Sequence, residues 1–216
     1  SDYDYIAGLK SFQDGMYQIQ DISSMLAGEY TAPKAGDTIV DVCGAPGGKS
    51  INAALKMSEQ GDCGRVIARD LSDYKVALID ENIKRLNITN IQTQVYDALD
   101  CDESLINKAD IVIADLPCSG LGIIGRKPDI KYNASPEKLQ SLVDLQRDIL
   151  KVVSRYVKSG GVLMYSTCTI NRAENEDNAD WICKESGFTK DGEYHQLLPA
   201  NNSGMDGFFV ARLIKN

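Results

Sequence analysis

Short apolar runs alternate with segments of helical periodicity along this chain of 216 residues. The runs are continuous and rich in β-branched residues, which is typical of strands buried on both faces of a parallel sheet. They predict strands at 38–43, 65–69, 91–96, 110–115 and 161–167. Between them, apolar residues recur three and four positions apart, which predicts helices. These helices are expected at 17–30, 48–58, 73–86 and 136–158.

The C-terminal part of the chain contains further signals for helix ends, helix starts and turns. Gly160 and Gly161 are expected to end the long helix. Asn171 with Glu174 three residues later has the form of a capping box, so a helix should start near Asn171. Residues 192–214 predict a terminal pair of strands with a turn at 201–204. The order of elements predicts an α/β fold with a mostly parallel, doubly wound sheet and a C-terminal antiparallel strand pair.

Length and composition restrict the class of protein. We expect one domain at 37–216, with residues 1–36 as an N-terminal extension packed on the same core. No apolar run approaches the ~20 residues that cross a bilayer, and the polar, acidic N-terminus is unlike a secretory signal. Six cysteines without a C-x-x-C pair, and a single histidine, argue against zinc and for reduced thiols. A cytoplasmic monomer without bound metal is therefore expected.

The sequence DVCGAPGGKS at 41–50 follows the first predicted strand and opens the next helix. A strand, a glycine-rich turn and a helix N-terminus together form a nucleotide-cofactor site. The pattern is not G-x-G-x-x-G, and Cys43 stands where a phosphate-binding loop has its first glycine. Lys49 can instead pair with the carboxylate of the methionine part of S-adenosylmethionine. The residues predicted to hold this cofactor in the turn are Gly44, Ala45, Pro46, Gly47, Gly48 and Lys49.

Acidic residues end the second and third predicted strands. Asp70, about 20 residues past the glycines, can accept hydrogen bonds from ribose hydroxyls. Asp97 is positioned to contact the exocyclic amine of an adenine. A single Asp at a strand end is more often a helix N-cap. Acids at successive strand ends favour an adenosine site, and hence a Rossmann-like methyltransferase fold that uses S-adenosylmethionine.

Two cysteines follow the next two predicted strands. Asp115 ends the fourth strand just before Cys118, and Cys168 ends the fifth. A free cysteine is usually a buried structural thiol. If the two strands are neighbours, however, both thiols face one cleft at the cofactor edge. Their polar, Gly/Ser/Thr-rich surroundings then favour a chemical role.

Methylation of cytosine at C5 requires such residues. A thiolate that adds to C6 makes C5 nucleophilic enough to attack a methyl sulfonium. Asp115 is placed to stabilise the charge that develops near N3. A second thiol can assist release of the adduct. The helix expected near Asn171 would lower the pKa of the nucleophilic thiol through its N-terminus.

Five ordered segments of the chain resemble the Sun/RsmB-type family of RNA cytosine-5 methyltransferases. They are DVCGAPGGKS, ARDLS, ADLPCSGLG, RKPDIKY and YSTCTINRAENE. The resemblance implies that Cys168 is the nucleophile, that Cys118 promotes release and that Asp115 contacts the base. It also implies that S-adenosylmethionine binds at the 44–49 turn, Asp70, Asp97 and Asp115. The substrate would be RNA, closest to the small-subunit ribosomal RNA of bacterial enzymes, contacted by Arg126 and Lys131, although Gly125 stands where those enzymes often carry a second basic residue.

The net charge of −8 bears on how RNA is bound. An acidic chain lacks the basic surface that usually supplies affinity for nucleic acid. The family usually carries an N-terminal RNA-binding domain, and no segment here resembles one. We therefore expect most RNA affinity to reside in a segment outside this chain or in a partner.

Three alternatives remain open. A DNA cytosine-5 methyltransferase would use Cys118 as nucleophile and would not need Cys168. A non-catalytic module of this fold would bind cofactor or RNA without transferring a methyl group. An adenine N6 methyltransferase normally has an aromatic residue where Cys118 stands.

Overall fold

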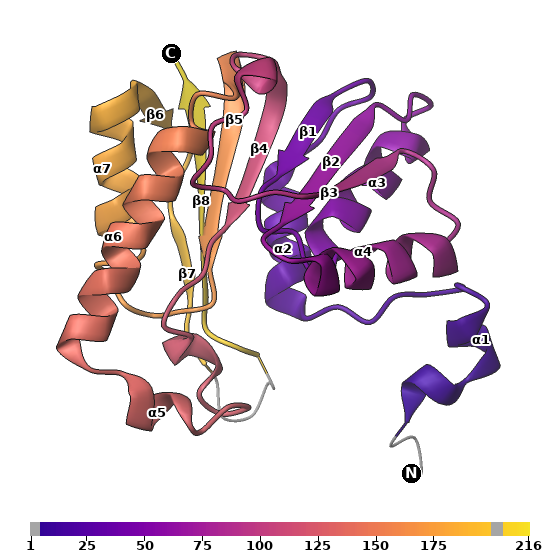
Figure 1. Cartoon of the computed structure of the whole chain (residues 1–216), viewed down its shortest axis with the longest axis horizontal. Helices are drawn as coiled ribbons and strands as arrows, with labels where there is room; N and C mark the ends of the chain where they lie inside the picture. Colours follow the sequence, from indigo (N-terminus) through magenta and orange to yellow (C-terminus); the bar gives the residue numbers. More distant parts are fainter. Residues whose placement is uncertain (1–4, 200–204) are drawn as a thin grey trace.

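The computed structural model describes residues 5–199 and 205–216, which form a sheet with helices on both faces (Figure 1). Among these residues, the strand order is β3-β2-β1-β4-β5-β8-β6, and β7 pairs with β8. Strands β1–β5 are parallel, and β8 runs antiparallel to β5. The strands are β1 (Thr38–Asp41), β2 (Arg65–Asp70), β3 (Ile91–Val95), β4 (Ala109–Asp115), β5 (Val157–Thr167), β6 (Phe188–Lys190), β7 (His195–Leu197) and β8 (Phe208–Lys215).

Helices cover the two faces of the sheet around separate apolar clusters. The α-helices are α1 (Lys10–Gln13), α2 (Ile22–Thr31), α3 (Gly48–Glu59), α4 (Asp73–Arg85), α5 (Ile130–Asn133), α6 (Pro136–Val153) and α7 (Glu176–Ser186). Figure 1 shows α6 and α7 on one side and α2–α4 on the other. Leu150 and Ile182 belong to the first cluster, and Ala27 and Ile51 to the second. The predicted α/β class and mostly parallel sheet with antiparallel strands are confirmed.

Local sequence explains where several helices begin. The hydroxyl of Ser135 accepts a hydrogen bond from the backbone N–H of Lys138 at 3.3 Å, and Pro136 occupies the first turn of α6, as predicted. Gly47 precedes α3 with φ +104°, and a Cβ there would lie 3.2 Å from the side chains of Ile51 and Ile79. Only glycine fits this turn, because an L side chain would be strained and crowded.

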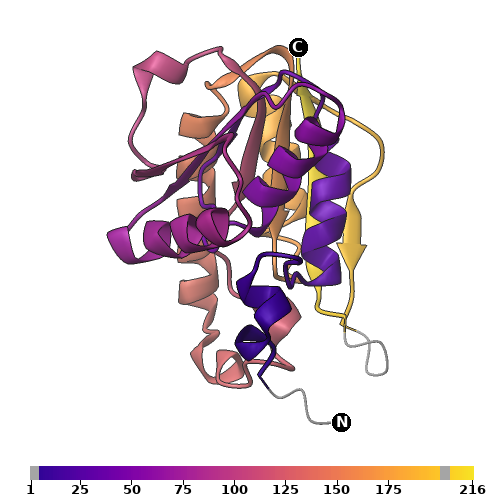
Figure 2. The same cartoon turned by 90° about the vertical axis from the view of Figure 1, so that its right-hand side faces the viewer.

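The N-terminal part departs from the prediction. A helix was expected over 17–30, but α2 begins only at Ile22, because Asp21 caps it by accepting the backbone N–H of Ser23 at 2.9 Å. Helix α2 contacts α3, β5 and β8, and lies alongside β8 in Figure 2. Residues 17–20 are non-helical and approach the turn after β1. They thus become part of the candidate site.

The predicted helix 136–158 was also too long. Helix α6 ends at Val153, and β5 begins at Val157, which pairs with Ala109. Tyr156 is 1% exposed, and its hydroxyl bonds to the backbone of Asp100 and Asp102. These contacts turn the chain into the sheet before Gly160. The Gly160–Gly161 pair lies within β5, beside a register shift between β4 and β5, and does not end the helix.

The helix predicted near Asn171 begins at Glu176. The predicted capping box does not form, because the amide of Asn171 donates to Glu174, whose carboxylate faces the loop after β4. The C-terminal pair is confirmed as β7 and β8, whereas β6 was not predicted. The turn expected at 201–204 lies outside the described residues. No helix in the described part of the chain is long and apolar enough to cross a membrane.

Candidate active site

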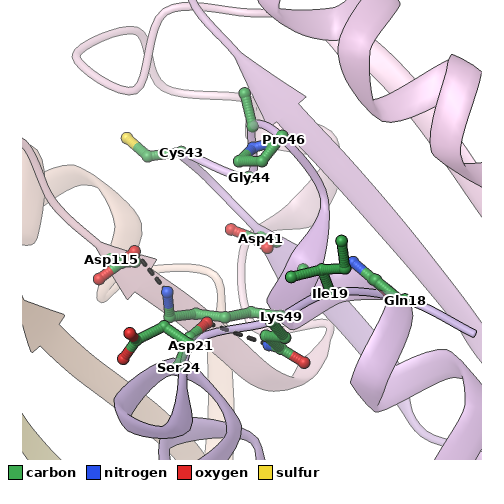
Figure 3. Close-up of a pocket in the computed structure, with 13 residues that line it drawn as sticks. Gln18, Ile19, Asp21, Ser24, Asp41, Cys43, Gly44, Pro46, Lys49 and Asp115 are labelled. Carbon is green, nitrogen blue, oxygen red and sulfur yellow. Dashed lines mark hydrogen bonds and ion pairs between the residues drawn. The ribbon is translucent and has the colours of Figure 1, made fainter. Parts of the chain in front are cut away.

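The carboxyl ends of β1, β4 and β5 meet where the strand order reverses between β1 and β4. This is where α/β sheets bind ligands. A cavity of about 230 Å³ opens there between the 43–49 turn and residues 18–21 (Figure 3). Asp41, Lys49 and Asp115 lie on its wall. The turn predicted to hold a cofactor therefore does line a cavity.

Lys49 and Asp115 form an ion pair on this wall. The Lys49 ammonium lies 2.6 Å from Asp115 Oδ2 (Figure 3). The hydroxyl of Ser166 donates to Asp115 Oδ1 at 2.7 Å. Burial alone would lower the pKa of Lys49, but the charges of Asp115 and Asp41 raise it above its usual value. Lys49 is thus held as a cation against the acid at the end of β4.

Asp41 is a member of the site that the sequence reading missed. It is 1% exposed at the end of β1, and Oδ2 accepts a hydrogen bond from Ser50 at 2.6 Å. Its Oδ1 is buried and has no hydrogen-bond partner among the described residues. Burial raises the pKa of Asp41 to about 6, against the opposing effects of Ser50 and Lys49. Asp41 could have been predicted from the sequence, because it is the first acidic residue at the end of a predicted strand.

Asp70 and Asp97 line a second cavity, of about 140 Å³, which shares Cys43 with the first. Asp70 Oδ2 accepts the backbone N–H of Ala45 at 3.1 Å, and Asp70 Oδ1 pairs with Lys75 at 2.9 Å. Asp97 accepts the backbone N–H of Leu99 at 2.9 Å. The apolar side chains of this cavity include Val42, Leu71, Ala98, Leu145 and Ile149. The two predicted acids therefore flank one slot with apolar walls.

The two cysteines meet as the strand order requires. Strands β4 and β5 are neighbours, and Asp115 is in register with Ser166. Cys118 Sγ lies 3.2 Å from Cys168 Sγ, and both residues are partly exposed. The hydrogen bond from Cys118, together with the charge of Lys49, lowers the pKa of Cys168 despite burial. The same bond, reinforced by burial, raises the pKa of Cys118.

This electrostatic arrangement corrects one expectation. Helix α7 begins at Glu176, and the side chain of its N-cap, Asn175, bonds to Thr167 and Thr169 on either side of Cys168. The Cys118 thiol and the Lys49 ammonium take the role that was expected of a helix N-terminus near Asn171. The opposite pKa shifts of the two groups favour Cys168 as the thiolate of the pair and Cys118 as the protonated thiol.

A buried carboxylate joins the two cysteine loops. Glu174 is fully buried and accepts hydrogen bonds from the hydroxyl and the backbone N–H of Ser119, at 2.6 and 2.9 Å. Gln146 also donates to Glu174, at 3.0 Å. The Ser119 hydroxyl lies 2.7 Å from that of Thr169, the residue after Cys168. Sequence reading assigned Glu174 to a helix cap and missed this role, which only the pairing of β4 with β5 reveals.

The two predicted RNA contacts make interactions within the chain. Arg126 pairs with Asp21 at 2.6 Å and with Asp206 at 3.1 Å. Lys131 lies on α5, with its ammonium 4.7 Å from the ring centroid of Tyr132. Arg126 thus tethers the segment that lines the first cavity, a role the sequence did not indicate. In the described residues, no group of three or more His, Cys, Asp or Glu side chains could hold a metal ion.

Comparison with known proteins places this site in a family. Residues 29–214 match the family described as 16S rRNA methyltransferase RsmB/F. The chain belongs to this family. Among curated RsmB/F relatives, the probable ribosomal RNA small subunit methyltransferase B of Bacillus subtilis is 38% identical over 97% of the chain. The chain spans about half the length of the curated relatives it matches, 50% in that case.

Solved structures agree with this membership of the RsmB/F family. The protein PH0851 superposes over 100% of the chain and 50% of its own length, with a TM-score of 0.90 and 30% identity. NSun6 from Pyrococcus horikoshii, crystallised with SFG, superposes over 97% of the chain and 56% of its own, with a TM-score of 0.85 and 28% identity. The predicted family and the predicted Rossmann-like methyltransferase fold are confirmed.

Proposed function

We propose that this chain transfers a methyl group from S-adenosylmethionine to C5 of a cytosine in RNA, through a covalent adduct between Cys168 and C6. The observation that carries the proposal is the 3.2 Å separation of Cys118 Sγ and Cys168 Sγ at the cofactor edge of the sheet. A DNA-type mechanism with Cys118 as the nucleophile gives no role to Cys168. The names of the relatives support small-subunit ribosomal RNA as the substrate.

The residues of the two cavities fit S-adenosylmethionine. The unpartnered Oδ1 of Asp41 is a buried acceptor for the α-ammonium of the methionine part. Asp70 and Asp97 flank the apolar slot, where they would bind the ribose hydroxyls and the adenine amine. The glycines of the 44–48 turn let the backbone approach closely. When bound, S-adenosylmethionine supplies an electrophilic methyl group to C5.

The first step uses the Cys168 thiolate. Its sulfur adds to C6 of the cytosine, and the π electron pair of the C5–C6 bond moves toward C5. C5 would then bond to the methyl carbon as the bond between that carbon and the cofactor sulfur breaks, and the demethylated cofactor would leave as a neutral thioether. N3 must take up a proton as the adduct forms, and Asp115, held by Lys49 and Ser166, would lie against N3 and pass on a proton that Lys49 donates to it.

The second step releases the methylated base. A base removes the proton from C5, the C5–C6 double bond re-forms, and the bond from C6 to Cys168 breaks. Cys118 donates its thiol hydrogen bond to the departing sulfur at 3.2 Å, which stabilises the leaving thiolate. Cys168 then returns to the state in which it began.

Separate serine variants test this division of roles. With S-adenosylmethionine and 16S ribosomal RNA, Cys168→Ser should neither methylate nor form an adduct. Cys118→Ser should accumulate a protein–RNA complex that survives a denaturing gel, because release is slowed. Cys63→Ser, an exposed thiol outside the site, should behave as the wild type. If Cys168→Ser still methylates while Cys118→Ser is inactive, the DNA-type assignment is correct and ours is wrong.

The substrate is tested in cells. Bisulfite sequencing of ribosomal RNA from a strain lacking the gene should show the loss of methylation at a single cytosine. An unchanged pattern would exclude ribosomal RNA as the substrate. Calorimetric binding of S-adenosylmethionine without methyl transfer to any RNA pool would instead support a non-catalytic module.

A further inference from the structure

The cysteine pair has chemistry of its own that does not depend on RNA. Cys118 Sγ and Cys168 Sγ are 3.2 Å apart, whereas a disulfide bond measures about 2.05 Å. The sulfurs need to approach by only about 1 Å to reach this length. Both residues are partly exposed, so small solutes reach them. The pair is thus poised to form a disulfide.

The loops that carry the sulfurs are tied together on both sides of the pair. The Ser119 and Thr169 hydroxyls lie 2.7 Å apart, and the backbone N–H of Gly122 donates to the carbonyl of Cys168 at 3.1 Å. A Cβ on Gly122 would lie 2.2 Å from the carbonyl oxygen of Gly207, so the loop packs tightly. The two thiols are therefore held side by side in the folded chain, at a high effective concentration.

The other cysteines differ in their surroundings. Burial raises the pKa of Cys43 and that of Cys183, so that less of each thiol is present as the reactive thiolate near neutral pH. Cys63 is exposed, with the Ser58 hydroxyl 3.6 Å from its sulfur. Among the thiols whose pKa departs from its ordinary value, only Cys168 has a lowered pKa, and it has a second thiol as neighbour. Thiolate character and an adjacent thiol are the two features of a reversible peroxide-sensing site.

We propose that Cys118 and Cys168 form a peroxide-oxidation site, in which Cys168 is oxidised first and Cys118 resolves it to a disulfide. The Cys168 thiolate attacks one oxygen of hydrogen peroxide, the O–O bond breaks, and hydroxide leaves and becomes water by taking up the proton that Cys168 released to the solvent when it ionised. This step makes a sulfenic acid on Cys168. The sulfur of Cys118 then attacks that of Cys168, the S–O bond breaks, and the departing hydroxide takes the Cys118 proton to leave as water.

The disulfide would switch the enzyme off and protect it. A bonded Cys168 has no thiolate, so methyl transfer stops until a dithiol reductant restores the pair. A sulfenic acid that finds no thiol proceeds to sulfinic and sulfonic acids, which reductants do not reverse. Cys118 would thus prevent the irreversible oxidation of Cys168. Formation of the disulfide stands apart from the proposed function, because its test reads sulfur chemistry and not methylation, whereas the loss of methyl transfer rests on that function.

The experiment treats the reduced chain with hydrogen peroxide, blocks free thiols and identifies peptides by mass without reduction. The wild type should yield a Cys118–Cys168 cross-linked peptide that dithiothreitol removes. With dimedone present, which labels sulfenic acids, Cys168 in Cys118→Ser should be labelled at least roughly ten times more than Cys168 in the wild type, because the resolving thiol is gone. Cys118→Ala serves as a second variant, and circular dichroism checks that each variant is folded. Cys63→Ser should still form the cross-link.

Two results would overturn the proposal. One is equal dimedone labelling of Cys168 in the wild type and in the folded Cys118 variants. The other is oxidation of Cys63 at peroxide concentrations that leave the cysteine pair reduced. Neither result bears on whether the chain methylates RNA, so failure here is distinguishable from failure of the proposed function.

Discussion

Ser119 donates two hydrogen bonds to the buried carboxylate of Glu174, from its hydroxyl at 2.6 Å and from its backbone N–H at 2.9 Å. Ser119 follows Cys118, and its hydroxyl also reaches Thr169, which follows Cys168. One carboxylate thus fixes the position of both reactive loops, although it touches neither sulfur. The distance between the sulfurs depends on a residue that follows β5 and precedes α7.

Glu174→Gln should therefore impair the reaction more than the binding of cofactor. Four donors face the carboxylate, from Ser119, Gln146 and Asn171, and a glutamine NH₂ group would oppose two of them. We expect a loss of about 1–3 kcal/mol in the free energy of unfolding and a slower single-turnover methyl transfer. The Kd for S-adenosylmethionine should stay unchanged in calorimetry. Glu185→Gln, an exposed change on α7, is the matched control.

A purely structural role for Glu174 would show itself differently. Alkylation of Cys168 by iodoacetamide, followed against pH, reports the pKa of that thiol. If Glu174 positions Cys118 beside it, the midpoint should shift upward in Glu174→Gln, because the stabilising Cys118 hydrogen bond is weakened. A less stable variant with an unshifted midpoint would contradict the positioning role.

Asp41→Asn should change how stability depends on pH. The folded chain raises the pKa of Asp41 to about 6, so Asp41 binds its proton more tightly in the folded state than in the unfolded state. Its contribution to stability is complete below the unfolded pKa and is lost as the pH rises through about 6. Relative to Asp41→Asn, the wild type should lose about 2 kcal/mol between about pH 4.5 and pH 7.

Urea unfolding at several pH values measures this difference. Asparagine keeps an acceptor for Ser50, so the comparison isolates ionisation from the hydrogen bond. Asp144→Asn, at an exposed position on α6, controls for general charge effects. Parallel pH profiles for the wild type and Asp41→Asn would show that Asp41 has an ordinary pKa. The charges of Lys49 and Asp115, which face Asp41, are the same in both proteins.

Lys49→Met should separate two roles for this lysine. The sequence suggested a contact with the cofactor carboxylate, but the ammonium is 2.6 Å from Asp115, the proposed contact of the base. Loss of Lys49 leaves Asp115 without its cation, so we expect single-turnover methyl transfer to fall by about 10². The Kd for S-adenosylmethionine should rise by less than about tenfold. Lys56→Met, on the same helix, is the control; a change in Kd alone would favour the cofactor role.

Local sequence pattern is enough to place residues at the ends of buried parallel strands. Asp70, Asp115 and Cys168 could be placed because they follow buried parallel strands, and such strands end at one edge of the sheet. The end of α6 could not be predicted in this way. Tyr156 bonds to the backbone of Asp100 and Asp102, which are distant in sequence, and these contacts override the helical periodicity. Glu174 was assigned to a helix cap for the same reason.

Arg126 shows most clearly what the sequence alone does not predict. Its place in the basic sequence RKPDIK predicts a contact with RNA, and that contact stays a prediction. Its two ion pairs join Asp21 and Asp206, residues separated along the chain, and no local pattern indicates them. Bonds from Ser23 and the charge of Arg126 lower the pKa of Asp21, against the opposing effect of burial. Asp21 is therefore ionised at neutral pH and held on the wall of the first cavity.

Arg126→Ala should consequently weaken the binding of S-adenosylmethionine. Without the tether, residues 18–21 lose an anchor over the first cavity, and an exposed pair of this kind contributes up to about 1 kcal/mol. We expect the Kd for S-adenosylmethionine to rise by up to about fivefold in calorimetry without RNA. Lys127→Ala, the exposed neighbour, should leave the Kd unchanged. Raising the salt concentration should weaken wild-type binding toward that of Arg126→Ala, because salt screens the same ion pairs. If both variants bind the cofactor like the wild type, Arg126 does not support the cavity, and RNA contact becomes its leading role.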